Sequence, residues 1–188
     1  MIIKNRVTAS KDWQVYSPVN DPTDALALNQ TDATGDSDVY WNDTAPTSSV
    51  FSVKSGATNT SGAATIGYIF SNRQGYSKFG SYTGNGNADG TFIYTGFKPA
   101  WVMVKSTSIS RDWQIFDNKR LGYNVDNNYL FANLSDAEGT ADRVDLLSNG
   151  FKWRTSANTY NASGNNYIYM AFAENPFVTS TGVPATAR

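Results

Sequence analysis

Apolar and polar residues alternate along most of the chain in short runs, which is the period of half-buried β-strands. Segments rich in Gly, Asn, Ser and Asp separate the runs at short spacing, a pattern typical of sandwiches and barrels. The fold class predicted is therefore all-β, as a β-sandwich or jelly-roll-like architecture. Strands are expected at residues 2–4, 13–16, 25–28, 39–41, 51–53, 65–70, 77–82, 91–94, 101–105, 113–116, 129–132, 144–147, 151–154 and 166–172.

Helical periodicity is almost absent, and only residues 135–144 are expected to form as much as one helical turn. Three polar segments are expected to be hairpin loops, because Asn and Gly readily adopt positive φ. They are "NGNADG" at 85–90, "SNG" at 148–150 and "NASGNN" at 161–166.

One short motif occurs twice in the sequence: "DWQV" at 12–15 and "DWQI" at 112–115. Five further blocks recur in the same order, and the offset between copies stays between 100 and 104 residues. We interpret this as an internal duplication. The other blocks pair 2–4 with 103–105, 26–33 with 130–137, 51–53 with 151–153, 59–62 with 161–164 and 66–70 with 168–172.

The duplication predicts a domain organisation of two β repeats. Copy one spans 1–75, copy two spans 76–175, and an extended tail occupies 176–188. The repeated blocks of copy two are preceded by residues 75–101, which have no counterpart before the first block of copy one. Copy one is thus expected to lack its leading strands, so either the chain is a piece of a longer protein, or copy two or a neighbouring subunit covers the missing sheet edge.

Two features of the copies bear on site prediction. Trp13 and Trp113 occupy matching strand positions, so we expect each to anchor the core of its copy rather than bind a ligand. The tail has no hydrophobic period. Its residues are therefore expected to contact a neighbour in an assembly or to remain free, and the assembly candidates are Pro176, Phe177 and Arg188.

Composition narrows the function classes. Charged residues make up 16% of the chain, against roughly 25% in an ordinary domain, and the formal net charge is −1. The sequence contains no cluster of Lys and Arg residues of the kind that nucleic-acid binding requires. The chain has no Cys and no His, which excludes disulfides, thiol nucleophiles, Cys/His zinc sites and histidine triads. No apolar run is long enough for a signal peptide or a membrane span, so no membrane insertion is expected.

Paired carboxylates could still support catalysis. The acidic residues of copy two have matching acidic positions in copy one, but nothing in the sequence brings them together, and solvated loops are the favoured interpretation. A structural Ca²⁺ ion bound by these loops is a weaker alternative, and no other cofactor is expected. The Gly-rich segment 84–90 is not predicted to bind phosphate, because it lacks the Lys-Ser/Thr pair and the βαβ context of a phosphate loop. The acidic positions are Asp136, Glu138, Asp142 and Asp145, with Asp32, Asp36 and Asp38 in copy one.

Aromatic residues beside amides and carboxylates form the remaining candidate site. Sugar recognition uses an aromatic platform with such partners, although core or inter-subunit packing is the favoured interpretation of any single ring. The candidate ligand-binding residues are Tyr40, Trp41, Tyr123, Asp126 and Tyr160.

Several long phrases resemble a family of repeated virion domains, which occurs in tail-fibre and related structural proteins of tailed phages, many of which infect aquatic bacteria. The family has no assigned biochemical activity, so the resemblance implies a structural, non-enzymatic protein in the virion. Members of the family usually carry a segment like residues 75–101 before each copy, and copy one lacks it, so the resemblance puts in doubt whether Met1 is the natural start of the protein. The final residues, "ATAR", resemble the C-terminal ends of family members. The phrases lie at 75–105, 123–138, 145–154, 161–177 and 182–188.

The first functional hypothesis is accordingly a tail-fibre or appendage module for host attachment. It would assemble with other virion proteins, form a homo-oligomer, with a trimer favoured, and bind host-surface polysaccharide through its loops. The alternative is a capsid-decorating protein that binds the shell through its tail and its open sheet edge. A lectin-like module or a glycan hydrolase is a third possibility.

Overall fold

The computed structural model describes residues 1–120, 124 and 127–175. The chain divides into two compact units, Met1–Phe70 and Ser71–Arg188, called unit 1 and unit 2 below. The division falls slightly before the boundary at residue 75 that the sequence predicts. Each unit is described by itself.

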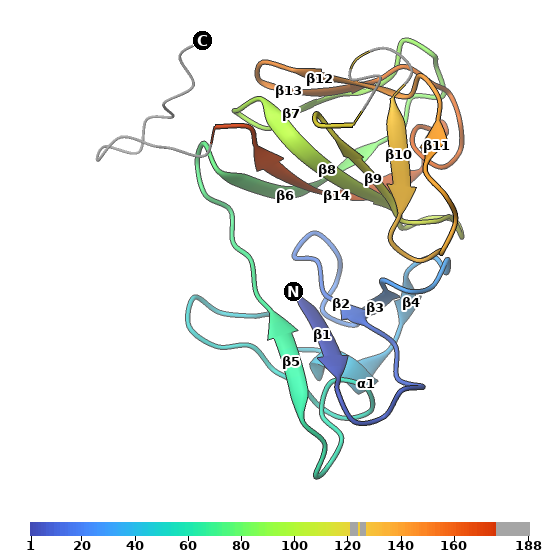
Figure 1. Ribbon diagram of the computed structural model, residues 1–188. Coiled ribbons are helices and arrows are strands. Elements are labelled where there is room, and N and C mark those ends of the chain that lie inside the picture. Colours follow the sequence, from blue (N-terminus) through green and yellow to red (C-terminus); the bar gives the residue numbers. More distant parts are fainter. Residues whose placement is uncertain (121–123, 125–126, 176–188) are drawn as a thin grey trace. The chain divides into compact units, whose positions relative to one another are not determined.

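Unit 1 is built on one antiparallel sheet with the strand order β4-β3-β2-β1-β5 (Figure 1). Its small core joins Ile3, Tyr16 and Trp41, with Met1, Tyr40 and Val53 packed against them. The strands are β1 (Ile2–Asn5), β2 (Gln14–Val15), β3 (Asp24–Ala27), β4 (Gly35–Asp36) and β5 (Thr65–Tyr68), and a short helix α1 (Asp38–Trp41) follows β4.

Unit 2 has two antiparallel sheets, one of six strands in the order β11-β10-β9-β8-β14-β6 and one of three in the order β12-β13-β7. The strands of the larger sheet are β6 (Ser77–Thr83), β8 (Pro99–Ser106), β9 (Gln114–Asp117), β10 (Asn128–Phe131), β11 (Gly139–Thr140) and β14 (Asn166–Ala173). Those of the smaller sheet are β7 (Phe92–Tyr94), β12 (Val144–Leu147) and β13 (Gly150–Trp153).

The core of unit 2 draws side chains from both of its sheets. Phe151 and Trp153 of the small sheet belong to one buried cluster with Val102, Phe116 and Tyr167 of the large sheet. All five are at most 1% exposed, which is the alternating, inward-facing arrangement of a β-sandwich. The all-β sandwich prediction is confirmed.

The two units share strand order and register. The order β4-β3-β2-β1-β5 corresponds strand for strand to β11-β10-β9-β8-β14. Ile2 faces Val15 in unit 1, and the block-matched residues Met103 and Ile115 face each other in unit 2. The same agreement holds at every strand pair common to both sheets. These shared pairings support the predicted duplication.

The repeated "DWQ" phrase carries a repeated cross-strand contact. In unit 2 the Trp113 amide donates to the Asn133 Oδ1 at 2.9 Å, and the Asn133 Nδ2 donates to the Asp112 Oδ1 at 2.8 Å. These hydrogen bonds therefore tie the residues that precede β9 to the residues that follow β10. Unit 1 repeats the contact at Asp12, Trp13 and Asn29.

The two tryptophans differ in environment. Trp113 is 2% exposed and buried, as expected of a core anchor. Trp13 is half-buried and stacks on Tyr68, with 6.3 Å between ring centroids. The Nζ of Lys4 lies 5.9 Å from the centroid of the Trp13 ring.

One predicted strand is wrong because its residues form helix α1. The Ser37 side chain accepts from the Val39 amide at the helix start, and Asn42 ends it with a φ of 54°. Ser and Asn favour these cap positions, and local capping thus overrides the alternating pattern at 39–41. The strand predicted at 51–53 does not form either; Lys54 and Ser55 make single backbone bonds to the helical residues instead.

The predicted hairpin at 148–150 is confirmed, because it joins β12 to β13 with Leu147 paired to Gly150. The other two predicted hairpin loops are wrong. Each joins strands of different sheets, β6 to β7 and β13 to β14, and the two loops bind each other through Gly86 N–H···O=C Asn161 at 2.8 Å. Residues 135–144 form no helix and contain β11.

Within the residues described, no helix is both long enough and apolar enough to cross a membrane.

Candidate functional site

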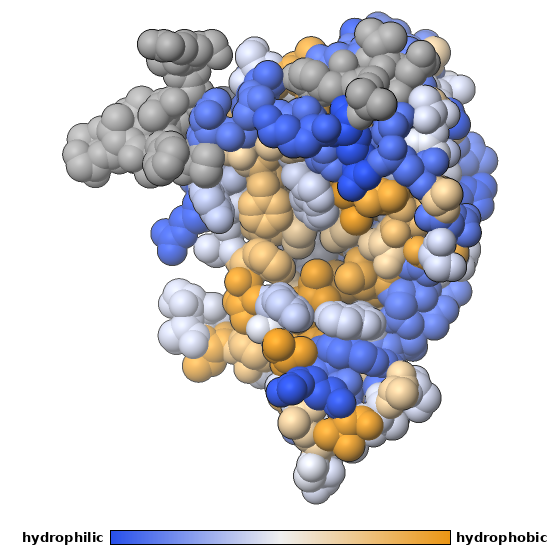
Figure 2. All heavy atoms as spheres, in the orientation of Figure 1, coloured by the Kyte–Doolittle hydropathy of each residue, from blue (hydrophilic) through white to orange (hydrophobic). Residues whose placement is uncertain are grey.

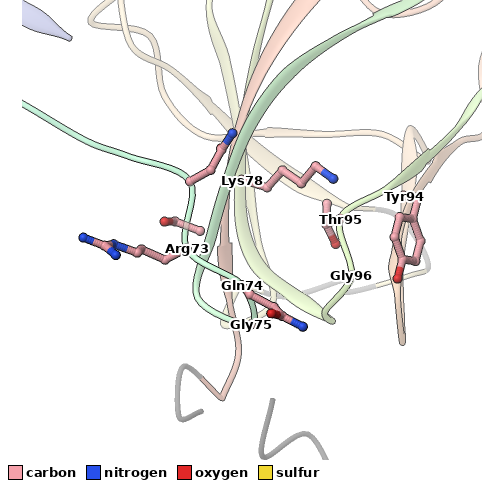
Figure 3. A pocket seen from close by; sticks show the side chains of 9 residues that line it. Arg73, Gln74, Gly75, Lys78, Tyr94, Thr95 and Gly96 are labelled. Atoms are coloured by element: carbon pink, nitrogen blue, oxygen red, sulfur yellow. The ribbon is translucent and has the colours of Figure 1, made fainter. Parts of the chain in front are cut away.

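A cleft of about 340 Å³ opens on unit 2 between two short segments, residues 72–78 and 94–96. The first segment leads into β6 and the second ends β7, so each sheet of the sandwich contributes one wall. This volume lies at the lower end of the range for small-ligand sites. Figure 3 shows Arg73 and Tyr94 at opposite ends of the opening.

The first wall is a tight turn closed by backbone hydrogen bonds. The Arg73 N–H donates to the Ser77 carbonyl at 2.9 Å, and the Ser77 N–H donates back at 3.0 Å. Gly75 has a φ of 68° at the turn, a conformation that glycine adopts without steric cost. Just before the turn, the Asn72 Oδ1 accepts from the Phe79 amide at 2.8 Å. The turn therefore holds the backbone of Arg73 and its neighbours in place.

The second wall is fixed to the hairpin between β12 and β13. The Thr95 and Gly96 amides both donate to the Asn149 carbonyl, at 3.0 and 3.2 Å. The Thr95 hydroxyl donates to the Phe97 carbonyl at 2.5 Å. Because Thr95 is 5% exposed, these bonds anchor the backbone from which Tyr94 projects.

Positive charge gathers at the cleft. The Lys78 Nζ lies 5.6 Å from the centroid of the Tyr94 ring, and this ring is 59% exposed. In the described part of the chain, neither Lys78 nor Arg73 forms an ion pair with a carboxylate. By contrast, Lys98 and Lys152 do form ion pairs, with Glu174 at 2.8 Å and with Asp89 at 2.6 Å.

The lining suits an anionic, hydroxyl-rich ligand. Two cations, the amides of Asn72 and Gln74, and the ring of Tyr94 border the cleft, and no carboxylate is among the described residues that line it. A guanidinium binds carboxylates bidentately, amides bond to hydroxyls, and an exposed aromatic ring offers an apolar face to a sugar. The arrangement therefore offers binding groups for a saccharide that carries a carboxylate.

The acidic residues singled out in the sequence are partly occupied by other contacts. Glu138 pairs with Arg120 and accepts from the Asn128 side chain at 2.6 Å, and Asp145 pairs with Arg154. Among the residues that the structure describes, no group of three or more acidic side chains is placed to hold a metal ion.

The predicted aromatic platform is not where the sequence placed it. Trp41 is 1% exposed and packs edge-to-face on Tyr16, and Tyr160 is 3% exposed and stacks on Trp153 at 4.8 Å. Both rings fill cores, so neither presents a face to a ligand, and we correct their assignment to structural residues. Tyr40 is half-buried against the core of unit 1.

The remaining predicted site residues lie outside the described part of the chain. These are Tyr123 and Asp126 among the ligand candidates, and Pro176, Phe177 and Arg188 among the assembly candidates.

Sequence reasoning missed the cleft, although one signal pointed to it. The cleft residues belong to the stretch around 72–96, most of which falls in the segment that precedes copy two and has no counterpart before copy one. A segment of unit 2 that has no counterpart in the sequence of unit 1 is the signal that could have drawn attention to this region.

Comparison with known proteins gives a family but no activity. No curated protein and no solved structure matches the chain significantly. A family model described as "Domain of unknown function (DUF7483)" matches residues 1–176. Because this match covers most of the sequence, the chain belongs to the DUF7483 family.

Proposed function

We propose that this chain is a non-enzymatic binding module that attaches to acidic polysaccharide on a cell surface through the cleft of unit 2. The observation that carries the proposal is the exposed ring of Tyr94 with the Lys78 Nζ 5.6 Å from its centroid, in a cleft that Arg73 also lines. Among the residues that the structure describes, neither cation forms an ion pair with a carboxylate. The cleft walls are held by backbone hydrogen bonds, which lowers the ordering cost of binding.

The setting that we propose is a phage virion, with the chain in a tail fibre or another exposed appendage. This part is supported by the resemblance in sequence to repeated virion domains. A homo-oligomer, for which we favour a trimer, would present several clefts together, and weak sites on one particle gain avidity through effective concentration. Partners in this setting are other virion proteins and host-surface polysaccharide.

Replacing Arg73 and Lys78 together by Ala is expected to abolish most of the binding to a carboxylated oligosaccharide such as a trimer of galacturonic acid. Hydrogen bonds to charged groups contribute about 1.5–3 kcal/mol each, so each single variant should lose roughly tenfold or more in affinity. Isothermal titration calorimetry at low salt measures the effect, since surface electrostatics weaken as salt is added.

The control variant is Lys119→Ala, which removes one positive charge from an exposed position of unit 2 away from the cleft lining. It should bind like the unmodified protein. The methyl ester of the same trimer keeps the shape and removes the charge, so it should bind weakly. Equal affinity for the acid and its ester, or a loss in Lys119→Ala as large as in the cleft variants, would refute the proposed recognition.

A capsid-decorating role is the second candidate, and it is favoured by the outer edge of β5 in unit 1, which pairs with no strand of the described residues. Immunogold electron microscopy of virions from a phage that encodes this chain separates the two settings. We expect gold at the tail or its appendages. Gold over the shell would support decoration instead, and intact virions without label would contradict a virion component altogether.

A further inference from the structure

Strand β5 ends the sheet of unit 1 with one edge unpaired. It bonds to β1 along Thr65–Tyr68, and no other strand of the described chain joins it. All four of its residues are exposed. An open, exposed edge of this kind is a template for pairing with a further strand.

Unit 2 shows what fills the equivalent edge. There β14 takes the place of β5, and its outer edge pairs with β6 from Ser77 to Thr83. β6 also contributes to the core: the Tyr82 ring stacks on Tyr167 with 5.0 Å between centroids, and its hydroxyl donates to the Tyr160 carbonyl at 2.8 Å. The same sheet is therefore completed in unit 2 and open in unit 1.

Apolar side chains remain uncovered around the open edge. Ile66, Tyr68 and Ile69 are 36%, 43% and 54% exposed. Of their equivalents in unit 2, Ile168 is 6% exposed and Ala171 is 0% exposed. Apolar surface shows among the hydrophilic residues in the lower part of the view in Figure 2, the part that unit 1 occupies in Figure 1.

We propose that unit 1 is a β-augmentation site, at which an extended segment of another polypeptide pairs antiparallel with the outer edge of β5. The partner has the chemistry of β6, a strand of sequence SKFGSYT with two aromatic residues and no acidic residue. Main-chain hydrogen bonds supply affinity in this mode of recognition, and side-chain pockets supply specificity.

The register adds a specific requirement for the partner. In unit 2, Tyr169 of β14 pairs with Gly80 of β6, and a Cβ on Gly80 would lie 2.9 Å from the Tyr169 Oη. In unit 1 the register puts Gly67 in the position of Tyr169. The partner strand can therefore carry a bulky side chain opposite Gly67, at the position where β6 carries Gly80.

A second copy of the chain is a poor source of a β6-like strand. Its own β6 is paired with β14 along its whole length from Ser77 to Thr83, so lending this strand would open the sheet of its own unit 2. The strand that pairs with β5 therefore has to come from a polypeptide that does not need this strand for its own fold.

Hydrogen exchange on the full chain tests the proposal. The probe is a synthetic peptide of residues 75–84, which contains β6, together with a second peptide that carries Gly80→Phe. At saturating peptide, the amides within Thr65–Tyr68 should exchange at least about tenfold more slowly, and the Gly80→Phe peptide should reach this protection at lower concentration. The protein itself is unchanged, so folding is not at issue.

The matched control peptide carries Ser81→Pro, which removes a ladder donor and breaks strand pairing, and it should give no protection. Three outcomes would overturn the proposal. They are unchanged exchange of β5 with both probe peptides, equal protection by the proline peptide, and protection of β5 in the free chain that rises with protein concentration together with dimer formation. The last result would make a second copy the occupant.

Discussion

Replacing Trp153 by Ala is expected to lower the free energy of unfolding of unit 2 by about 3–5 kcal/mol, the usual cost of deleting a large aromatic side chain from a core. Trp153 is fully buried. Its ring contacts Tyr82, Phe116 and Tyr160 at centroid distances of 6.1, 5.7 and 4.8 Å. The substitution thus opens a cavity where side chains from both sheets meet.

Urea unfolding followed by tryptophan fluorescence measures this cost. The matched control is Trp101→Ala in the same unit, since Trp101 is only half-buried and has a tilted contact with Phe172 at 5.7 Å. Its loss should be clearly smaller. Equal losses for the two variants, or a Trp153→Ala loss below about 1 kcal/mol, would show that the sandwich core is not centred where the structure places it.

Alkaline pH is expected to destabilise the protein steeply. Burial raises the pKa of Tyr82 well above its ordinary value, and burial likewise raises the pKa of Tyr160. Above pH 10 the unfolded chain loses these protons while the folded chain keeps them, so stability is complete below about pH 10 and falls as pH rises. Each such tyrosine contributes a slope of about 1.4 kcal/mol per pH unit.

Urea midpoints measured from about pH 8 to about pH 11 test this expectation, with tyrosinate absorbance as a second signal. The variant Tyr160→Phe keeps the ring and removes the titrating hydroxyl, which donates to the Gln114 side chain. Its stability should fall less steeply above pH 10. A folded protein in which every tyrosine ionises near pH 10 without loss of stability would contradict the assigned burial.

Much of the scaffold could be predicted from sequence because strand pairing follows local patterns. The repeated blocks at 2–4, 12–15, 26–33 and 66–70 predicted strands that correspond to strands of unit 2, and their offsets reproduce the register of the pairs β1–β2, β1–β5 and β2–β3. The block at 51–53 forms no strand, although its match at 151–153 lies in β13. The pattern failed at 39–41, where the Ser37 and Asn42 caps select a helix. It also failed at 85–90 and 161–166, since turn residues alone do not say whether the next strand joins the same sheet.

The cleft was harder to predict, and the reason is topological. Arg73 and Tyr94 lie on opposite sides of one opening because β6 joins the large sheet and β7 the small one. Nothing local in the sequence encodes that separation. The burial of single aromatic residues could not be predicted from their neighbours either. Trp41 and Tyr160 are each followed by a polar Asn, yet both side chains lie in cores.

The most direct test of the proposed function is to map an acidic oligosaccharide onto the chain by amide chemical shifts. Titrating the isotope-labelled protein with a galacturonic acid trimer should shift the amides of residues 72–78 and 94–96 together, with one binding curve, and the methyl ester should leave them in place. Shifts confined to another surface, or none at saturating ligand, would contradict the assignment of the cleft as the binding site.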